Sequence, residues 1–467
     1  MVFSSLIFLY VFFPLCILIY LAVPGQKAKN IVLCLSSLVF YAWGEPLWVV
    51  LLIFSALVDY VNSKIIDAHR GLWQAKAALA ASVVINLGLL VTFKYLDFFL
   101  GVFGWVARVE APVVGLTLPI GISFYTFQTM SYTIDVYRGD VKVQNNFMNF
   151  LLFVSLFPQL IAGPIVRYSE IAEQIDGRTS VMSDMAAGLT RFMTGLGKKV
   201  LIANFAGATA ENILTADLAR LSCVEAWVGI LCFSFQIYFD FSGYSDMAIG
   251  LGRFFGFRYG ENFRHPYIAR SITEFWRRWH ISLGTFFRDY VYIPLGGNRR
   301  RQTRNILIVW FLTGLWHGAS WNFVLWGLYF GALLLLEKHC LGGVLRKLKW
   351  GAAAYTFPLV VLGWVLFYFT DLSRALTFVG VLFGGGVPFD ARARILLLNN
   401  LPLLGLCVVA STPLGAWAAG KARAYAKAGL PRALGAAAFL TYHAALLLLC
   451  TASLVGASYN PFLYFRF

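Results

Sequence analysis

Long stretches without any charged residue dominate this chain. Such stretches cover residues 2–26, 77–93, 111–134, 147–166, 305–336, 350–370 and 433–465, and shorter, interrupted ones cover residues 31–44, 46–58, 226–239 and 395–419. About 20 apolar residues suffice for a helix to cross the hydrocarbon core of a bilayer, where open strand edges are excluded. The pattern therefore predicts an all-α polytopic membrane protein with about 9–12 transmembrane segments, some of them re-entrant.

Composition agrees with this fold class. The chain of 467 residues is 59% hydrophobic and only 13% charged, whereas soluble domains carry about a quarter charged residues. Its formal charge of +16 is explained by basic cytoplasmic loops and by attraction to anionic membrane lipids. Alternatively, some cations attract a polyanionic cytosolic ligand such as a coenzyme or a phosphopantetheine carrier. No motif indicates a nucleic-acid partner.

The chain reads as one membrane-embedded domain over residues 1–467, because no linker, charged tail or internal repeat interrupts it. Lys27 and Lys29 follow the first apolar stretch, which places the amino terminus outside and the first loop in the cytoplasm. No basic residue precedes that stretch and no cleavage pattern follows it, so we expect an anchor and not a signal peptide. The seven cysteines never form CxxC and are interpreted as packing residues.

The middle of the chain mixes charged and aromatic residues and cannot be a series of lipid-facing spans. Ser271 is followed three residues later by Glu274, the spacing of a capping box, which predicts an amphipathic helix over residues 272–290. Steps of three and four residues would place four side chains on one face of it, namely Trp276, His280, Leu283 and Phe287.

His317 is the clearest candidate for chemistry. It lies inside the uncharged stretch 305–336, which is too long for one untilted span and contains glycine and polar residues that predict a break near its middle. Ionisable side chains at bilayer depth usually face a cavity and mark function. Desolvation favours the neutral imidazole, which can act as a base, although a lone apolar histidine is often only a packing residue.

Other polar residues leave alternatives open. His280 lies 37 residues before His317, and the two converge if the amphipathic helix packs against the broken span. Two histidines without cysteine or carboxylate at ligand spacing make a poor metal set, so we expect no metal. His443 lacks any supporting motif and is interpreted as a packing residue. Asp240 and Asp246 either form ion pairs with arginines or line a polar tunnel.

Acyl transfer explains a buried histidine economically. A hydroxyl is a poor nucleophile at neutral pH, so a base that removes its proton lowers the barrier, and a thioester supplies a good leaving group. A thioester made in the cytosol and a hydroxyl presented outside must meet within the membrane. A tunnel that excludes bulk water would allow this meeting and would limit hydrolysis.

Several motifs resemble the membrane-bound O-acyltransferase (MBOAT) family, most closely its alginate O-acetylation branch. They lie at residues 118–140, 157–167, 238–252, 261–299 and 314–327, so the core motifs fall within residues 118–336. The first ten residues and the segment 458–467 also look like that branch, and the resemblance is weakest over residues 372–432. The pairing of RRWHISL with LWHG is the most specific feature.

This resemblance implies a ring of transmembrane helices with re-entrant and amphipathic helices, in the bacterial inner membrane. It implies that His317 is the catalytic histidine and that His280 is an orienting or proton-sharing partner. It further implies acetyl-CoA as the acyl donor, an exopolysaccharide such as alginate as the acceptor, and a periplasmic or membrane-anchored acetyltransferase partner.

Two other functions remain open from the sequence. The D-alanylation proteins of teichoic acids share the two-histidine pattern but take their acyl group from an acyl carrier protein. A transporter with histidines as a proton relay is more distant, because we find neither inverted repeats nor several charged residues inside spans.

Overall fold

A computed structural model describes residues 1–415, 417–418, 420–421, 432–456 and 462–463. All regular structure in these residues is helical, which confirms the predicted all-α membrane fold. The chain divides into two compact units, Met1–Phe192 with Tyr244–Gly260, and Met193–Gly243 with Glu261–Phe467. We call them unit 1 and unit 2. The prediction of one domain over residues 1–467 stays a prediction.

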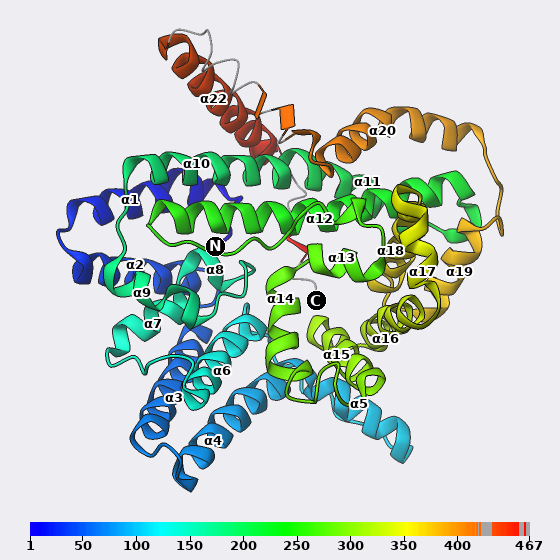
Figure 1. The fold of residues 1–467 in the computed structure, drawn as a ribbon. Helices are drawn as coiled ribbons and strands as arrows, with labels where there is room; N and C mark the ends of the chain where they lie inside the picture. Colours follow the sequence, from blue (N-terminus) through cyan, green and yellow to red (C-terminus); the bar gives the residue numbers. More distant parts are fainter. Residues whose placement is uncertain (416, 419, 422–431, 457–461, 464–467) are drawn as a thin grey trace. The chain divides into compact units, whose positions relative to one another are not determined.

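Figure 1 shows the helices of unit 1. Their buried aromatic side chains form its core. Phe3 lies at its centre, where its ring stacks on Tyr244 at 4.6 Å and packs against Phe8 at 5.0 Å. The helices that lie wholly in unit 1 are α1 (Phe13–Ala22), α2 (Gln26–Ala42), α3 (Trp48–Ala68), α4 (Trp73–Leu90), α5 (Leu96–Ala107), α6 (Ile122–Arg138), α7 (Phe147–Ser155), α8 (Phe157–Leu160) and α9 (Tyr168–Gly177).

Two long helices belong to both units, since α10 (Met182–Gly197) and α12 (Cys223–Phe254) each cross the boundary. Unit 2 contains the central charged segment and the predicted histidines. Its own helices are α11 (Asn204–Leu214), α13 (Ile272–Arg278), α14 (Ile281–Phe287), α15 (Gln302–His317), α16 (Trp321–Leu336), α17 (Gly342–Leu348), α18 (Ala353–Tyr368), α19 (Leu372–Leu382), α20 (Ala391–Ala410) and α22 (Arg432–Gly456).

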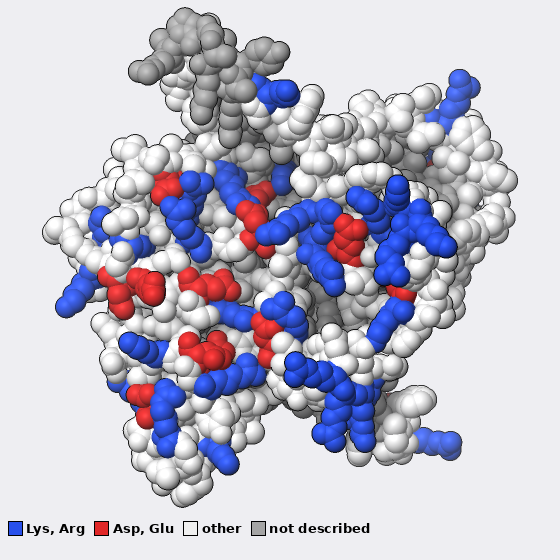
Figure 2. All heavy atoms as spheres, in the orientation of Figure 1, with Lys and Arg blue, Asp and Glu red and all other residues white. Residues whose placement is uncertain are grey.

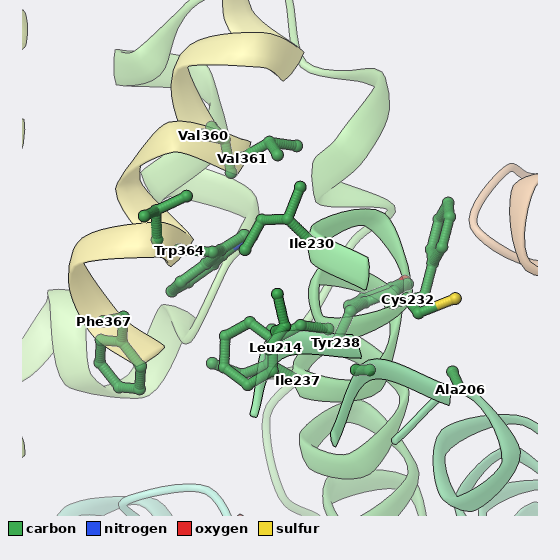
Figure 3. Packing of buried hydrophobic residues seen from close by; sticks show 14 of the residues in the cluster. Ala206, Leu214, Ile230, Cys232, Ile237, Tyr238, Val360, Val361, Trp364 and Phe367 are labelled. Atoms are coloured by element: carbon green, nitrogen blue, oxygen red, sulfur yellow. The ribbon is translucent and has the colours of Figure 1, made fainter. Parts of the chain in front are cut away.

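Apolar side chains of α11, α12 and α18 form much of the core of unit 2. Figure 3 shows Trp364 and Phe367 on α18 lying beside Ile230, Ile237 and other residues of α12. All of these side chains are buried. This core fixes the position of α18, and therefore of Phe367, whose ring packs against His317.

Six described helices are long and apolar enough to cross a membrane. They are Trp48–Ala68, Trp73–Ala107, Cys223–Phe254, Trp321–Tyr368, Ala391–Ala410 and Leu434–Gly456, where consecutive helices are taken together. The first predicted stretch forms a shorter apolar helix, Phe8–Ala22. The expected number of 9–12, which included re-entrant segments, therefore stays a prediction.

One predicted stretch, residues 111–134, was assigned too broadly. Its first residues are irregular and mostly exposed, and α6 begins only at Ile122, after Gly121. Gly121 has a φ of +79° in a close turn against the Leu160 carbonyl, a conformation that favours glycine. The uncharged composition of residues 111–121 thus reflects an apolar loop and not the start of a span.

Candidate active site

The predicted amphipathic helix is broken at His280. Residues 272–290 form α13 and α14, separated by Trp279 and His280, and the chain continues from Arg288 in a wider π-helical turn. Ser271 caps α13 as expected, because its side chain accepts a hydrogen bond from the Glu274 N–H at 2.9 Å. His280 has a φ of +45°, which lies in the left-handed region and ends the helical hydrogen-bond pattern. The prediction of one continuous helix was therefore wrong.

Asn262 accounts for this break. Its backbone carbonyl accepts the Ile281 N–H at 3.0 Å, and its side-chain oxygen accepts the Ser282 N–H at 3.2 Å. These two bonds satisfy backbone N–H donors in the first turn of α14, because such donors have no partners within their own helix. A completely buried asparagine thus fixes the backbone on which His280 lies.

The same asparagine selects one tautomer of His280. Because Asn262 Oδ1 accepts a backbone N–H, this atom is the oxygen, and the His280 Nδ1 at 3.3 Å must donate to it. The lone pair is then on Nε2, which is buried and has no hydrogen-bond partner among the described residues. Burial lowers the pKa of His280 to about 3, so the ring is neutral at physiological pH.

His317 ends α15, at the break that the sequence predicted. Gly318 follows it in extended conformation, and α16 begins at Trp321. The His317 ring packs edge-on against Trp326 at 5.0 Å and against Phe367 at 5.2 Å. It is 9% exposed, so the imidazole is surrounded by aromatic rings and contacts little solvent.

The two histidines approach each other through an aromatic side chain. Trp316 packs against the His280 ring at 5.8 Å and against the His317 ring at 5.0 Å. Phe241 also contacts His280, at 4.6 Å, and lines the space beside His317. The predicted convergence of helix and broken span is therefore observed, with indole and phenyl groups between the rings.

Among its described residues, unit 2 contains four cavities of which each has at least one lining residue in common with the next. The basic cavity, of about 790 Å³, shares Arg277 with the His280 cavity, of about 620 Å³. The His280 cavity shares Trp279 with the His317 cavity, of only about 30 Å³. The last shares Leu463 with the Asp371 cavity, of about 430 Å³. His317 thus lines the smallest of these four cavities, which has room for about one water molecule.

The basic cavity carries most of the positive charge near the site. Five cations line it, namely Arg270, Arg277, Lys338, Arg346 and Lys349, against two carboxylates, Glu274 and Glu337. Figure 2 shows Lys and Arg gathered on the face that carries α13 and α17. Glu337 is already engaged with the backbone N–H of Thr273 at 3.0 Å, and Glu274 pairs with Arg278 at 2.6 Å. The remaining field is positive.

The two aspartates of α12 form ion pairs, which is one of the two alternatives that the sequence left open. Asp240 lies 2.7 Å from the Lys199 Nζ in a fully buried pair, and Asp246 pairs with Arg191 at 2.9 Å. Asp240 nevertheless also lines the His317 cavity, and its Oδ2 accepts the Leu463 N–H at 2.8 Å. The rest of the segment 458–467 lies outside the described residues.

The other candidates lie away from these cavities. His443 is half-buried on α22, and its Nδ1 lies 2.8 Å from the Phe439 carbonyl of its own helix. Five of the cysteines are buried, Cys340 is exposed, and none forms a disulfide. Within the described ranges no cluster of three potential metal ligands occurs.

Sequence reasoning did not identify Asn262, Lys199 or Trp326 as part of this region. Asn262 stands 18 residues before His280, and Lys199 stands 41 residues before Asp240. Such separations carry no periodic signal. Trp326 lies within the GLWHGASWNFVLWG motif, so that motif was the one available indication for it.

The chain is similar over its whole length to known membrane proteins of one family. The family model of "MBOAT, membrane-bound O-acyltransferase family" matches residues 138–370. A probable alginate O-acetylase AlgI of Azotobacter vinelandii is 39% identical over 100% of both chains, and one of Pseudomonas aeruginosa is 42% identical over 87% of this chain and 79% of its own. A peptidoglycan O-acetyltransferase of Helicobacter pylori is 36% identical over 80% of this chain and 78% of its own. This chain therefore belongs to the membrane-bound O-acyltransferase family, and it is a multi-pass membrane O-acetyltransferase.

Proposed function

We propose that this protein takes an acetyl group from a cytoplasmic thioester, acetyl-CoA, and delivers it across the inner membrane for O-acetylation of an exported polysaccharide such as alginate. The observation that carries the proposal is the set of four neighbouring cavities, of which His317 lines the smallest. A site of this kind gives an acyl donor and a hydroxyl acceptor separate approaches to one imidazole.

The basic cavity supports a polyanionic donor on the cytoplasmic side. Arg270, Arg277 and Arg346 can form paired hydrogen bonds with phosphate oxygens, and lysines add unpaired charge. Basic residues concentrate on the cytoplasmic side of membrane proteins, so this end would face the cytosol. The His280 cavity, which shares Arg277, is large enough to receive an extended thioester arm.

The Asp371 cavity supports an acceptor from the opposite side. α15 begins beside the basic loop and its 16 residues span about 24 Å before His317. Phe367, which contacts His317, is followed within four residues by the exposed Thr370 and Asp371. A hydroxyl entering this cavity would therefore approach the imidazole over a short distance.

The small volume beside His317 supports acetyl over a long acyl chain. About 30 Å³ has room for a carbonyl or a methyl group, but not for a fatty-acyl tail. The hydroxyl acceptor would belong to the polysaccharide or to a periplasmic or membrane-anchored acetyltransferase partner. The mostly exposed apolar faces of α20 and α22 would contact membrane lipids.

The reaction assigns a separate task to each histidine. His317 removes the proton of the acceptor hydroxyl, the oxygen attacks the thioester carbonyl, and the C–S bond breaks as His317 returns the proton to the thiolate. The products are an ester and free thiol. His280, with its lone pair on Nε2, would orient the donor or share a proton, since it lies beside the larger cavity.

Labelled acetyl transfer by purified protein in vesicles tests this proposal. Acetyl-CoA carrying a labelled acetyl group is supplied on one side, and polysaccharide with the periplasmic acetyltransferase on the other. His317→Ala should abolish labelling, whereas His443→Ala, the same change at a half-buried histidine of α22 that lines none of these cavities, should label like the unchanged protein. His280→Ala should retain a small residual rate, because water can partly replace an orienting group.

Two results would overturn parts of the proposal. Full labelling by His317→Ala would refute the assignment of the base. Labelling from an aminoacylated carrier protein, with none from acetyl-CoA, would replace acetyl transfer by the D-alanyl transfer known for teichoic acids.

A further inference from the structure

Trp326 holds a hydrogen-bond donor that nothing in the described structure satisfies. Its side chain is completely buried on α16, and its indole Nε1 has no hydrogen-bond partner among the described residues. A buried donor without an acceptor costs free energy, and native structures keep few of them. By contrast, the indole N–H of Trp227 donates to the Leu382 carbonyl at 3.0 Å. The donor of Trp326 therefore calls for an acceptor that arrives with substrate.

Trp326 lies beside the predicted base. Its ring is 5.0 Å from the His317 ring at an interplanar angle of 80°, and both residues line the His317 cavity. The same wall includes Phe241 and Phe367, which offer no hydrogen bond, and Asp240, which is an acceptor bound by Lys199. A carbonyl oxygen entering this space meets Trp326 as a neutral donor.

The backbone holds His317 and Trp326 together. Gly327 directly follows Trp326, and a Cβ at Gly327 would overlap the Trp310 carbonyl oxygen and lie 3.1 Å from the Gly314 Cα. Gly314 in turn stands three residues before His317. The two glycines therefore let α15 and α16 touch backbone to backbone, and this contact sets the positions of the base and the indole with little freedom.

Acyl transfer requires a donor at this place. When the acceptor oxygen bonds to the thioester carbonyl carbon, the carbonyl electron pair moves to its oxygen and creates an oxyanion. In a dry aromatic cavity this charge is unstable unless a fixed N–H faces it. The charge disappears when the pair returns to the carbon and the C–S bond breaks.

We infer that the indole N–H of Trp326 donates a hydrogen bond to this oxyanion, so that Trp326 is a catalytic residue of the acetyl transfer. The inference rests on the proposed function, with His317 as the base. Trp364 lines the same cavity, its buried Nε1 likewise has no hydrogen-bond partner among the described residues, and its ring stacks on Trp326 at 6.2 Å. Trp326 is chosen because it both lines this cavity and contacts the His317 ring, at 5.0 Å; Trp316 contacts that ring as well but is not among the residues that line the cavity.

Removal of the N–H with retention of the ring tests this role. Trp326→Phe, and incorporation of benzothienylalanine, which replaces the indole N–H by sulfur, should each lower kcat for acetyl transfer about 100-fold, as loss of one oxyanion donor does elsewhere. KM for acetyl-CoA should stay within about twofold, because the bond forms only in the transition state. Benzothienylalanine preserves the shape, so it separates loss of the donor from loss of packing.

Trp227→Phe is the matched control. It removes an indole N–H that has a structural acceptor, and it should lower thermal stability while kcat stays unchanged. Trp364→Phe should lower kcat less than Trp326→Phe.

The outcomes distinguish the two hypotheses. If the benzothienylalanine protein keeps kcat within about threefold of the unchanged enzyme while His317→Ala is inactive, the role of Trp326 is refuted and the proposed function stands. If Trp364→Phe alone produces the large loss, the donor was assigned to the wrong indole. If both His317→Ala and the benzothienylalanine protein transfer acetyl normally, His317 is not the base and the role of Trp326 is refuted with it. If the unchanged enzyme transfers no acetyl from acetyl-CoA, the proposed function itself is wrong.

Discussion

Gly327→Ala should damage this enzyme through a single methyl group. The added Cβ would overlap the carbonyl oxygen of Trp310, which is part of the rigid backbone of α15 and cannot rotate away. To relieve the overlap, α15 and α16 must separate by on the order of 1 Å. Overpacking of a tight core by one methyl group typically costs about 1–3 kcal/mol, and we expect a loss of unfolding free energy in this range.

The same displacement should affect catalysis more than stability. His317 is the last residue of α15 and Trp326 precedes the altered position, so a shift between the helices changes the distance between base and indole directly. A misplacement of about 1 Å can lower a rate by about 100-fold. We expect kcat for acetyl transfer to fall by about this factor while the protein remains inserted and mostly folded.

The assay combines denaturant titration in detergent with labelled acetyl transfer. Gly405→Ala is the control, because this exposed glycine lies inside α20 and an added Cβ would meet nothing within 4 Å. Alanine is the better helix former, so Gly405→Ala should be neutral or stabilising by up to about 1 kcal/mol, with unchanged kcat. Wild-type stability and kcat in Gly327→Ala would refute the helix-contact argument.

Three further predictions concern the polar groups around the cavities. Asn262→Ala should lower kcat because His280 is then no longer held in one tautomer. Asn262→Asp should retain activity and raise the pKa of His280, which moves the acid limb of the pH–rate profile to higher pH. Identical pH–rate profiles for the Asp variant and the unchanged enzyme would contradict this. The pKa of His280 falls from 6.5 to about 3 on folding, so below pH 6.5 the unfolded state binds more protons than the native state. Lowering the pH to 5 should therefore reduce the unfolding free energy of the native protein by about 2 kcal/mol more than that of His280→Gln. Lys199→Met should cost about 3–5 kcal/mol by leaving Asp240 unpaired, and Lys199→Met with Asp240→Leu should recover much of it, as thermal melts would show.

Much of this protein could be predicted from the chain itself. Uncharged stretches of about 20 residues report directly on the membrane, since the cost of burying charge there is high and local. The break at His317 was also visible, because glycine and polar residues interrupt an otherwise apolar run. Likewise, the Ser271–Glu274 cap depends only on residues three apart.

The tertiary structure decided what local patterns cannot contain. His280 is on a helix by periodicity, yet Asn262 ends that helix and turns the ring toward a cavity. Asp240 was expected to pair with an arginine and instead pairs with Lys199, because helix packing brings that lysine within 2.7 Å.

The sequence by itself determined that this is a helical membrane protein and which imidazole is the candidate base, since both follow from hydropathy and motif. Only the tertiary structure decided that His317 lines a small cavity beside larger ones, next to an indole donor that has no acceptor among the described residues. The physical reason is that cavities and unsatisfied groups arise where distant segments meet. Backbone contact at Gly314 and Gly327 is one such meeting, and its geometry is a property of packed helices.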